Sequence, residues 1–402
     1  MQTELADFIR DTPEGREAEA ILRKCVHCGF CTATCPTYQL LGDDLDSPRG
    51  RIYLIKRALE GAEVTDKTRL HLDRCLTCRA CETTCPSGVR YGRLADIGRA
   101  VVEARTSRGL WDRLKRRALG FGVPRTAVFG FFLKAGHLFA AFLPREIRRK
   151  IPPSARPPGE WPAPRHARRM LALAGCVQPA IAPSINAAAA RVLDRLGISL
   201  IEAPGAACCG AVRYHLNQQE DGRDDMRALI DAWWPMVERG EVEAIVMTAS
   251  GCGATVREYG ELLAHDPRYR DKAARISSLT KDLCEVVPPQ ALAQRAAAGR
   301  VAFHSPCTLQ HGQQVRGKVE ALLSGAGYEL TQVRDAHLCC GSAGTYSLLQ
   351  PELAGELRGR KLACLEEGGP EVLATANIGC LAHLQGGTST AVRHWIELLD
   401  VE

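Results

Sequence analysis

The 402-residue sequence is poor in aromatic residues, at 5% of the chain, and it lacks any long uncharged apolar run. A membrane-spanning helix needs about 20 consecutive apolar residues, so we expect none here. Residues 1–24 carry no secretory signal, which predicts a cytoplasmic chain whose thiols face a reducing environment. No G-x-G-x-x-G fingerprint follows a predicted strand, so we do not expect the chain to bind FAD or NAD by itself.

The net charge of +6 is mild but unevenly distributed, because residues 101–170 hold sixteen Lys and Arg against four Asp and Glu. A basic block of this kind is typical of a solvated linker, a lipid-facing surface or a nucleic-acid-binding segment. The block lacks the interleaved aromatic residues of a recognised nucleic-acid-binding fold, so nucleic acid is not expected as a partner.

The middle of this block, residues 127–143, is apolar, and clusters of basic residues flank it at 113–117 and 145–150. Three interpretations stay open. The stretch is a helical hairpin that covers a domain junction, a surface for a partner subunit, or an amphipathic helix that contacts a membrane surface. Residues 151–164 are rich in proline and predict a linker.

Eight of the eighteen cysteines form two copies of one pattern: Cys25-x2-Cys28-x2-Cys31-x3-Cys35-Pro36 and Cys75-x2-Cys78-x2-Cys81-x3-Cys85-Pro86. Bacterial ferredoxins bind two 4Fe–4S clusters with this run. Three closely spaced cysteines can surround three corners of a cubane, and the fourth normally binds the other cluster. Zinc is the alternative, but zinc sites usually use two separated cysteine pairs. The expected ligands are Cys25, Cys28, Cys31 and Cys85 for cluster 1, and Cys75, Cys78, Cys81 and Cys35 for cluster 2.

A 39-residue spacer separates the two runs and contains a helical pattern with Ile52, Ile55 and Leu59 on one side. Ser47 suits an N-cap and Pro48 suits the first helical position. A helical spacer of this length favours an α-helical ferredoxin domain over the compact β type.

Residues 169–402 contain an internal repeat. Strand-like segments at 170–174 and 300–303 each lead to a cysteine, and a Cys-Cys-Gly motif follows after thirty-one intervening residues. A second apolar strand, 244–247 or 372–375, then leads to a Gly-Cys pair. Parallel α/β folds bind ligands at the carboxyl ends of their strands, so each repeat is expected to gather its thiols there. The thiols are Cys176, Cys208, Cys209 and Cys252 in repeat 1, and Cys307, Cys339, Cys340 and Cys380 in repeat 2.

These four thiols per repeat predict a cluster or another metal, although buried and inert cysteines are the alternative. The sequence thus predicts a multi-domain α+β protein, with an α-helical ferredoxin domain followed by two α/β repeats. The expected domains are the ferredoxin domain at 1–100, a basic and apolar helical connector at 101–168, repeat 1 at 169–298 and repeat 2 at 299–402.

The Cys-Cys-Gly repeats resemble the cysteine-rich domains of heterodisulfide-reductase-type proteins. The order of a two-cluster ferredoxin module and two such repeats is similar to the glycolate oxidase (glycolate dehydrogenase) iron–sulfur subunits, and residues 46–51 and 377–380 strengthen this resemblance. The resemblance implies an FAD-containing partner subunit that oxidises glycolate and a second flavoprotein-like subunit. It also implies electron transfer through this chain to a quinone or another acceptor, at the cytoplasmic face of the membrane.

One departure concerns the last cysteine motif of each repeat. Heterodisulfide reductases have Cys-x-x-Cys there, whereas this chain has Ala249 and Asn377 in place of the first cysteine. A cubane, another metal and an empty site all stay open for the repeats. The alternative functions are the electron-transfer subunit of a glycerol-3-phosphate or lactate dehydrogenase, a thiol/disulfide redox enzyme, and a metal-bound scaffold without catalysis.

Overall fold

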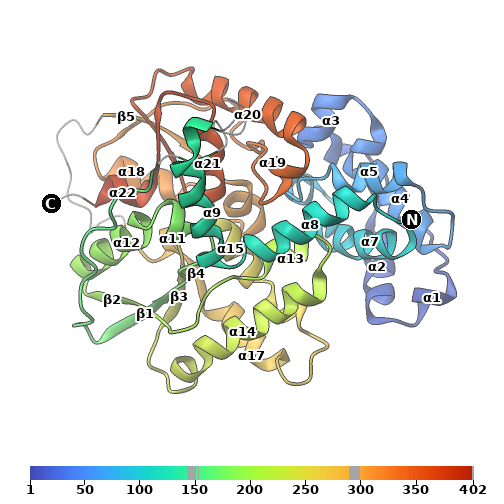
Figure 1. Cartoon of the computed structure of the whole chain (residues 1–402). Helices are drawn as coiled ribbons and strands as arrows, with labels where there is room; N and C mark the ends of the chain where they lie inside the picture. The colour runs from blue at the N-terminus through green and yellow to red at the C-terminus, as the bar shows by residue number, and fades with distance from the viewer. Residues whose placement is uncertain (143–150, 153, 289–298, 401–402) are drawn as a thin grey trace. The chain divides into compact units, whose positions relative to one another are not determined.

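The computed structural model describes residues 1–142, 151–152, 154–288 and 299–400 (Figure 1). The chain forms two compact units. Unit 1 comprises Met1–Arg116 and His337–Lys361, and unit 2 comprises Arg117–Ala336 and Leu362–Glu402. The segment that contains the second Cys-Cys pair therefore packs with the N-terminal part of the chain.

The described part of unit 1 is helical, which confirms the expected α-helical ferredoxin-like region. Ser47 Oγ accepts a hydrogen bond from Gly50 N and caps the helix that begins at Pro48, as the sequence predicts. Thr12 caps the helix that begins at Pro13 in the same way. The elements of the N-terminal segment are α1 (Asp7–Arg10), α2 (Pro13–Lys24), η1 (Phe30–Thr32), α3 (Pro36–Leu41), η2 (Asp44–Asp46), α4 (Pro48–Leu59), α5 (Asp66–Asp73), α6 (Ala80–Thr84) and α7 (Tyr91–Arg105).

One hydrophobic core holds these helices together. Leu22 of α2, Ile55 and Leu59 of α4, and Leu94 of α7 are almost completely buried in it. Gly98 of α7 lies so close to Ile55 that an added Cβ would come within 2.5 Å of it, so α4 and α7 approach closely at this point. The core therefore fixes the two loops that follow α2 and α5, and these loops carry the cysteine runs.

Unit 2 contains two four-stranded parallel sheets of identical topology, with strand orders β2-β1-β3-β4 and β6-β5-β7-β8. The strands are β1 (Arg168–Ala172), β2 (Ile198–Glu202), β3 (Ala244–Met247), β4 (Thr280–Asp282), β5 (Arg300–His304), β6 (Glu329–Leu330), β7 (Val372–Thr375) and β8 (Ala391–His394). The expected strands at 170–174, 244–247, 300–303 and 372–375 are thus confirmed, with β1 shifted by two residues. The matching orders confirm the internal repeat.

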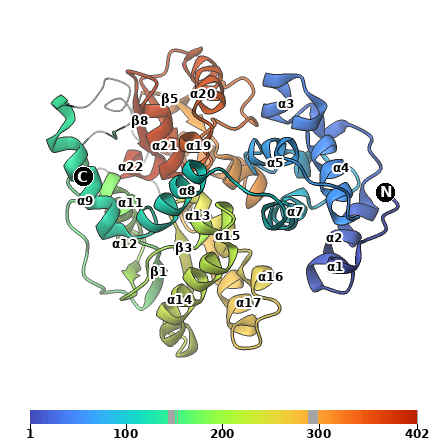
Figure 2. The ribbon, with the colours of Figure 1, turned by 45° about the vertical axis from the view of Figure 1, so that its right-hand side comes forward.

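Helices connect the strands and cover the sheets. In α12 (Ser184–Arg195) a run of four alanines lets the helix lie against β2, and both views show α12 beside α22 (Trp395–Leu399) (Figures 1 and 2). The other elements of the C-terminal half of the chain are α11 (Gln178–Ile181), α13 (Ala211–His215), α14 (Gln219–Glu238), α15 (Ser250–Val256), α16 (Tyr259–Leu262), α17 (Arg270–Leu279), η4 (Leu283–Glu285), η6 (Thr308–Gly312), α18 (Lys318–Gly325), α19 (Tyr346–Leu349), α20 (Pro351–Glu366) and α21 (Ile378–Gln385). Of these, α19 and the first part of α20 belong to unit 1.

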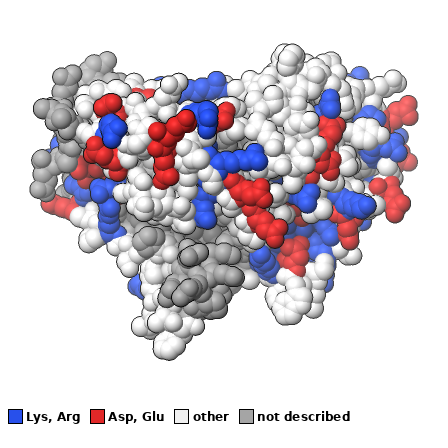
Figure 3. Space-filling view, turned by 90° about the horizontal axis from the view of Figure 1, so that it is seen from above, with Lys and Arg blue, Asp and Glu red and all other residues white. Residues whose placement is uncertain are grey.

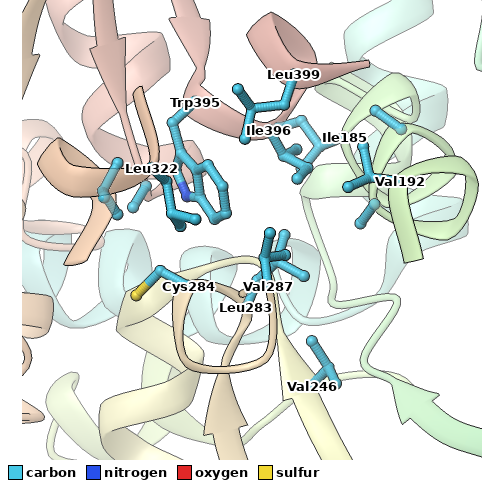
Figure 4. Close-up of a cluster of buried hydrophobic side chains, with 14 of the residues drawn as sticks. Ile185, Val192, Val246, Leu283, Cys284, Val287, Leu322, Trp395, Ile396 and Leu399 are labelled. Atoms are coloured by element: carbon cyan, nitrogen blue, oxygen red, sulfur yellow. The ribbon is translucent and has the colours of Figure 1, made fainter. Parts of the chain in front are cut away.

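The two repeats share one hydrophobic core (Figure 4). Ile185 and Val246 from repeat 1 meet Leu322 and Trp395 from repeat 2, and all four side chains are almost completely buried. A buried Trp removes about 200 Å² from water, which is worth roughly 5 kcal/mol before the entropy cost of ordering is subtracted. Neither sheet therefore has a complete core without the other.

The expected helical connector contains α8 (Leu110–Gly122), α9 (Thr126–Leu138) and η3 (Ala140–Phe142). Basic residues 145–150 of the predicted flanking cluster lie outside the described residues. In the described part of the chain, no helix is both long enough and apolar enough to cross a membrane. Basic and acidic side chains are interspersed on the face shown in Figure 3.

Candidate metal centres

The two cysteine runs of unit 1 form loops with matching backbone conformations. The loop after α2 has positive φ angles at His27 (55°) and Gly29 (86°), and the loop after α5 has them at Thr77 (53°) and Arg79 (61°). These positions are equivalent in the two runs. Left-handed residues turn the chain tightly enough for successive backbone N–H groups to face a common anionic centre.

The first loop lines a cavity that is open to solvent. Cys25, Cys28 and Cys31 line it from one run and Cys85 lines it from the other. We call these four residues site 1. They are the set that the sequence predicts for cluster 1, and Cys81 also touches this cavity.

The second loop lines a second cavity. Cys75, Cys78 and Cys81 line it together with Cys35 of the first run, and we call these four residues site 2. Each cavity is lined by three cysteines of one run and the fourth cysteine of the other, which is the arrangement of a two-cluster ferredoxin rather than of two separated zinc-binding pairs. The assignment of ligands stays a prediction.

Several donors point at the sulfur atoms of site 2. Tyr91 Oη and Thr77 N each donate a hydrogen bond to Cys75 Sγ at 3.4 Å. Thr37 Oγ1 lies 3.3 Å from Cys35 Sγ. Burial alone would raise the pKa of the Cys75 thiol, but the positive charges of Arg51 and Arg99 and the Tyr91 hydroxyl lower it below the usual value. The thiolate form that binds iron is thus stabilised at Cys75.

A buried ion network supports this second cavity. Arg51, only 1% exposed, donates to Asp46 Oδ1 (3.2 Å), to Thr37 Oγ1 (3.1 Å) and to the carbonyl of His71 (2.7 Å). Asp46 is fully buried and also accepts from Arg74 at 2.9 Å. The sequence marked residues 46–51 as a helix start but gave no sign that two of them form a buried ion pair.

Site 1 has a different environment. Val89 N donates to Cys85 Sγ at 3.5 Å. Burial, followed by the neighbouring Cys25, raises the pKa of the Cys31 thiol to about 11. His27 also lines the cavity, although it is not one of the expected ligands. Burial and the positive charge of Arg49 lower the pKa of its imidazole.

Repeat 1 brings its four predicted thiols together at the carboxyl end of its sheet. Cys208 accepts hydrogen bonds from Cys176 and Cys209, and Cys209 also bonds to Cys252. The pKa of Cys208 is therefore held well below its usual range, whereas the hydrogen bonds raise the pKa values of Cys176 and Cys209. One thiolate surrounded by thiols is a suitable starting arrangement for binding a thiophilic metal.

The Cys-Cys-Gly motif has the same local geometry in both repeats. Gly210 N donates to Cys208 Sγ and Gly341 N donates to Cys339 Sγ, each at 3.4 Å. Both glycines have positive φ, and a Cβ at Gly210 would lie 2.4 Å from the carbonyl oxygen of Gly222. Glycine is required there because both the backbone angle and the close packing exclude a side chain.

The predicted thiols of repeat 2 fall in different units. The buried pair Cys339 and Cys340 belongs to unit 1, whereas Cys307 and Cys380 follow β5 and β7 in unit 2. Asn377, at the position of the missing cysteine, donates from Nδ2 to Cys380 Sγ at 3.4 Å. Its Oδ1 accepts from Gly251 N of repeat 1 at 3.1 Å.

Comparisons with known proteins agree with this division of the chain. Residues 21–89 match the 4Fe-4S dicluster domain family, and residues 170–257 and 301–385 both match the Cysteine-rich domain family. The Glycolate oxidase iron-sulfur subunit of Escherichia coli K12 is 56% identical over all of this chain and 98% of its own length. The Probable glycolate oxidase iron-sulfur subunit of Bacillus subtilis 168 is 29% identical over 92% of this chain and 90% of its own length. Lactate utilization protein A of the same organism is 27% identical, over 56% of this chain and 96% of its own length.

Proposed function

Because the chain belongs to the family of glycolate oxidase iron–sulfur subunits, we propose that it carries single electrons away from glycolate oxidation within an oxidoreductase complex. The observation that carries the proposal is the pair of cavities in unit 1. Each is lined by three cysteines of one run and the fourth cysteine of the other.

A 4Fe–4S cluster at each site would accept and release one electron at a time. We propose Cys25, Cys28, Cys31 and Cys85 as the ligands of one cluster, and Cys75, Cys78, Cys81 and Cys35 as those of the other. The chain's own part is to hold the thiolates, to limit water and to set the local charge. The backbone N–H groups of Thr77 and Val89 and the hydroxyl of Tyr91 contribute hydrogen bonds to the sulfurs.

The substrate-oxidising step belongs to partner subunits in this proposal. An FAD-containing subunit would take two electrons from glycolate, and this chain, with a second flavoprotein-like subunit, would pass them on singly. The acceptor would be a quinone or another oxidant, reached through the cysteine-rich half. The thiols of repeat 1 and repeat 2 are proposed as further cluster or metal sites, and the boundaries 1–100, 101–168, 169–298 and 299–402 as the functional domains.

A membrane-facing surface is proposed on α9, at the cytoplasmic side. Phe131, Phe132 and Leu138 each expose about two thirds or more of their surface. Arg125 and Lys134 lie on or beside the same helix, a combination that suits the interface of an anionic bilayer. A shallow attachment of this kind would bring the chain close to a lipid-soluble quinone.

A lactate donor is the second candidate, since Lactate utilization protein A is 27% identical over 56% of this chain. Glycerol 3-phosphate is the third donor to compare. The same electron carrier could serve each of these three substrates. The substrates would then differ only in the partner subunit that oxidises them.

The test is electron paramagnetic resonance of the anaerobically purified complex before and after the addition of glycolate, lactate or glycerol 3-phosphate. The proposal is supported if glycolate, but not lactate or glycerol 3-phosphate, produces the signals of reduced clusters. A count of two spins per chain would support the two sites of unit 1. If dithionite reduces the clusters but glycolate does not, the assignment of glycolate as the electron donor is wrong.

Paired variants provide the control for ligand assignment. Cys28→Ser should disturb one cluster signal, whereas Cys364→Ser, which changes a buried cysteine outside both runs, should leave both signals intact. Equal effects of the two variants would contradict the ligand sets.

A further inference from the structure

The two cavities of unit 1 differ in the charge and the hydrogen bonds that surround their sulfur atoms. At site 2, the buried Arg99 donates to the carbonyl of Cys75 at 2.7 Å and to Thr77 Oγ1 at 2.9 Å. The buried Arg51 lies 3.9 Å from Cys35 Sγ. Asp46 offsets only part of this charge, because it also pairs with Arg74 at 2.9 Å.

At site 1 the positive charges are more exposed to water. Arg49 lines the cavity but pairs with Asp44 at 2.9 Å, and about a third of its side chain is exposed. The amino group of Met1 donates to the backbone carbonyl of Cys25 at 2.8 Å rather than to a sulfur. Cys28 itself is exposed. Solvent screens charges at such positions more strongly than it screens buried ones.

Reduction adds one negative charge to a cluster, so buried cations and donors to sulfur favour the reduced form. We propose that the cluster of site 2 has the higher reduction potential, that electrons pass from site 1 to site 2, and that the Tyr91 hydroxyl contributes to this difference through Cys75. The transfer moves one electron and no proton, so site 1 is oxidised as site 2 is reduced. This inference rests on the proposed function, which supplies the flavin donor.

The surroundings of the two sites agree with this direction. Cys28 of site 1 lies between Val26 and Phe30, which are 68% and 61% exposed, so this side is accessible to a donor. Tyr346 donates from Oη to the carbonyl of Arg74 at 3.2 Å, directly before Cys75 of site 2. The segment that carries Tyr346 also carries Cys339 and Cys340, so the cysteine-rich part of unit 1 contacts the chain next to site 2.

The decisive experiment is an anaerobic redox titration of the full chain followed by electron paramagnetic resonance. Tyr91→Phe keeps the buried ring and removes only the O–H···S bond to Cys75. It should lower the reduction equilibrium constant of the higher-potential cluster about tenfold, equivalent to about 59 mV for one electron. The lower-potential cluster should not change. A shift of the lower-potential cluster, or of neither cluster, would overturn the inference.

Tyr53→Phe is the matched control, because Tyr53 is about half exposed on α4 and lines neither cavity. Both potentials should stay as in the unaltered chain. Cys28→Ser is the second variant, and it decides the order even if Tyr91→Phe fails to assemble. It should alter the lower-potential signal only, whereas loss of the higher-potential signal would reverse the order of the sites.

The two proposals fail in different ways. An unaltered chain without two 4Fe–4S signals would contradict the proposed function itself. Two signals whose order is inverted in the variants would contradict the inference alone and leave the electron-transfer function standing.

Discussion

Replacing Arg51 with methionine tests the buried ion network of unit 1. The guanidinium donates to Asp46, Thr37 and the carbonyl of His71, and no more than 1% of the Arg51 surface is exposed. Methionine fills a similar volume without a charge. The change would leave Asp46, which is fully buried, with Arg74 and His71 as its remaining partners.

The expected loss of stability depends on Arg74, the basic residue that still pairs with Asp46. Breaking a buried ion pair from one side costs about 3–5 kcal/mol when the other charge is left uncompensated. Because Arg74 still pairs with Asp46, we expect the lower end, about 3 kcal/mol, or roughly 150-fold in the equilibrium constant for opening. Arg49→Met is the matched control, two residues away. Its ion pair with Asp44 is partly exposed and should contribute about 1 kcal/mol or less.

Native-state hydrogen exchange of the anaerobic full chain measures both variants at the amides of α4. Arg51→Met should speed exchange by roughly 150-fold and Arg49→Met by no more than about fivefold. The visible absorbance of the clusters reports in parallel whether they are retained. Equal exchange rates in the two variants would refute the argument that burial makes the Arg51 network the stronger one.

Three further predictions concern unit 2. Cys209→Ser should abolish metal binding by the thiols of repeat 1, whereas Cys284→Ser should leave the metal content of the protein unchanged. Equal metal contents in the two variants would argue against a metal site in repeat 1. Asn377→Ala removes the hydrogen bonds to Cys380 and to Gly251 of repeat 1, and should lower the free energy of unfolding by about 1–2 kcal/mol in a urea titration. Burial lowers the pKa of His394 to about 4, so the unfolded chain binds its proton first as the pH falls. The free energy of unfolding therefore decreases as the pH falls below about 6.5, by about 1.4 kcal/mol at pH 5.5. Thermal unfolding of His394→Gln should lack this pH-dependent loss of stability.

The sequence predicted the elements whose signals are local. Ser47 and Pro48 mark the start of α4 because capping depends on residues only three positions apart. The strands β3 and β7 are short apolar runs followed by a glycine and a cysteine, and their parallel neighbours bring the carboxyl ends to one edge. These signals were enough to predict the repeat and its strands, whereas the thiol sites stay predictions, and the Cys339–Cys340 pair of repeat 2 belongs to unit 1.

Long-range polar contacts could not be predicted in the same way. The charges of Arg51 and Asp46 alone would favour a surface position, because charged side chains are rarely buried unless they are paired. Tyr91 is sixteen residues from Cys75, and only the packing of α7 brings its hydroxyl to that sulfur. Asn377 offered the clearest missed signal, since an Asn before a helix and a Cys three residues later are close enough to bond.

The two repeats have the same topology but differ at the position of the missing cysteine. Ala249 and Asn377 both have extended backbones before a helix, α15 and α21, so the backbone itself would accept a cysteine at either position. Ala249 instead packs into the shared core, and Asn377 joins Cys380 to the backbone of repeat 1. A thiol at 377 would lose the amide oxygen that accepts from Gly251 N and leave that donor without its strong acceptor. The departure from the five-thiol pattern in repeat 2 therefore replaces a ligand position with a contact that holds the two repeats together.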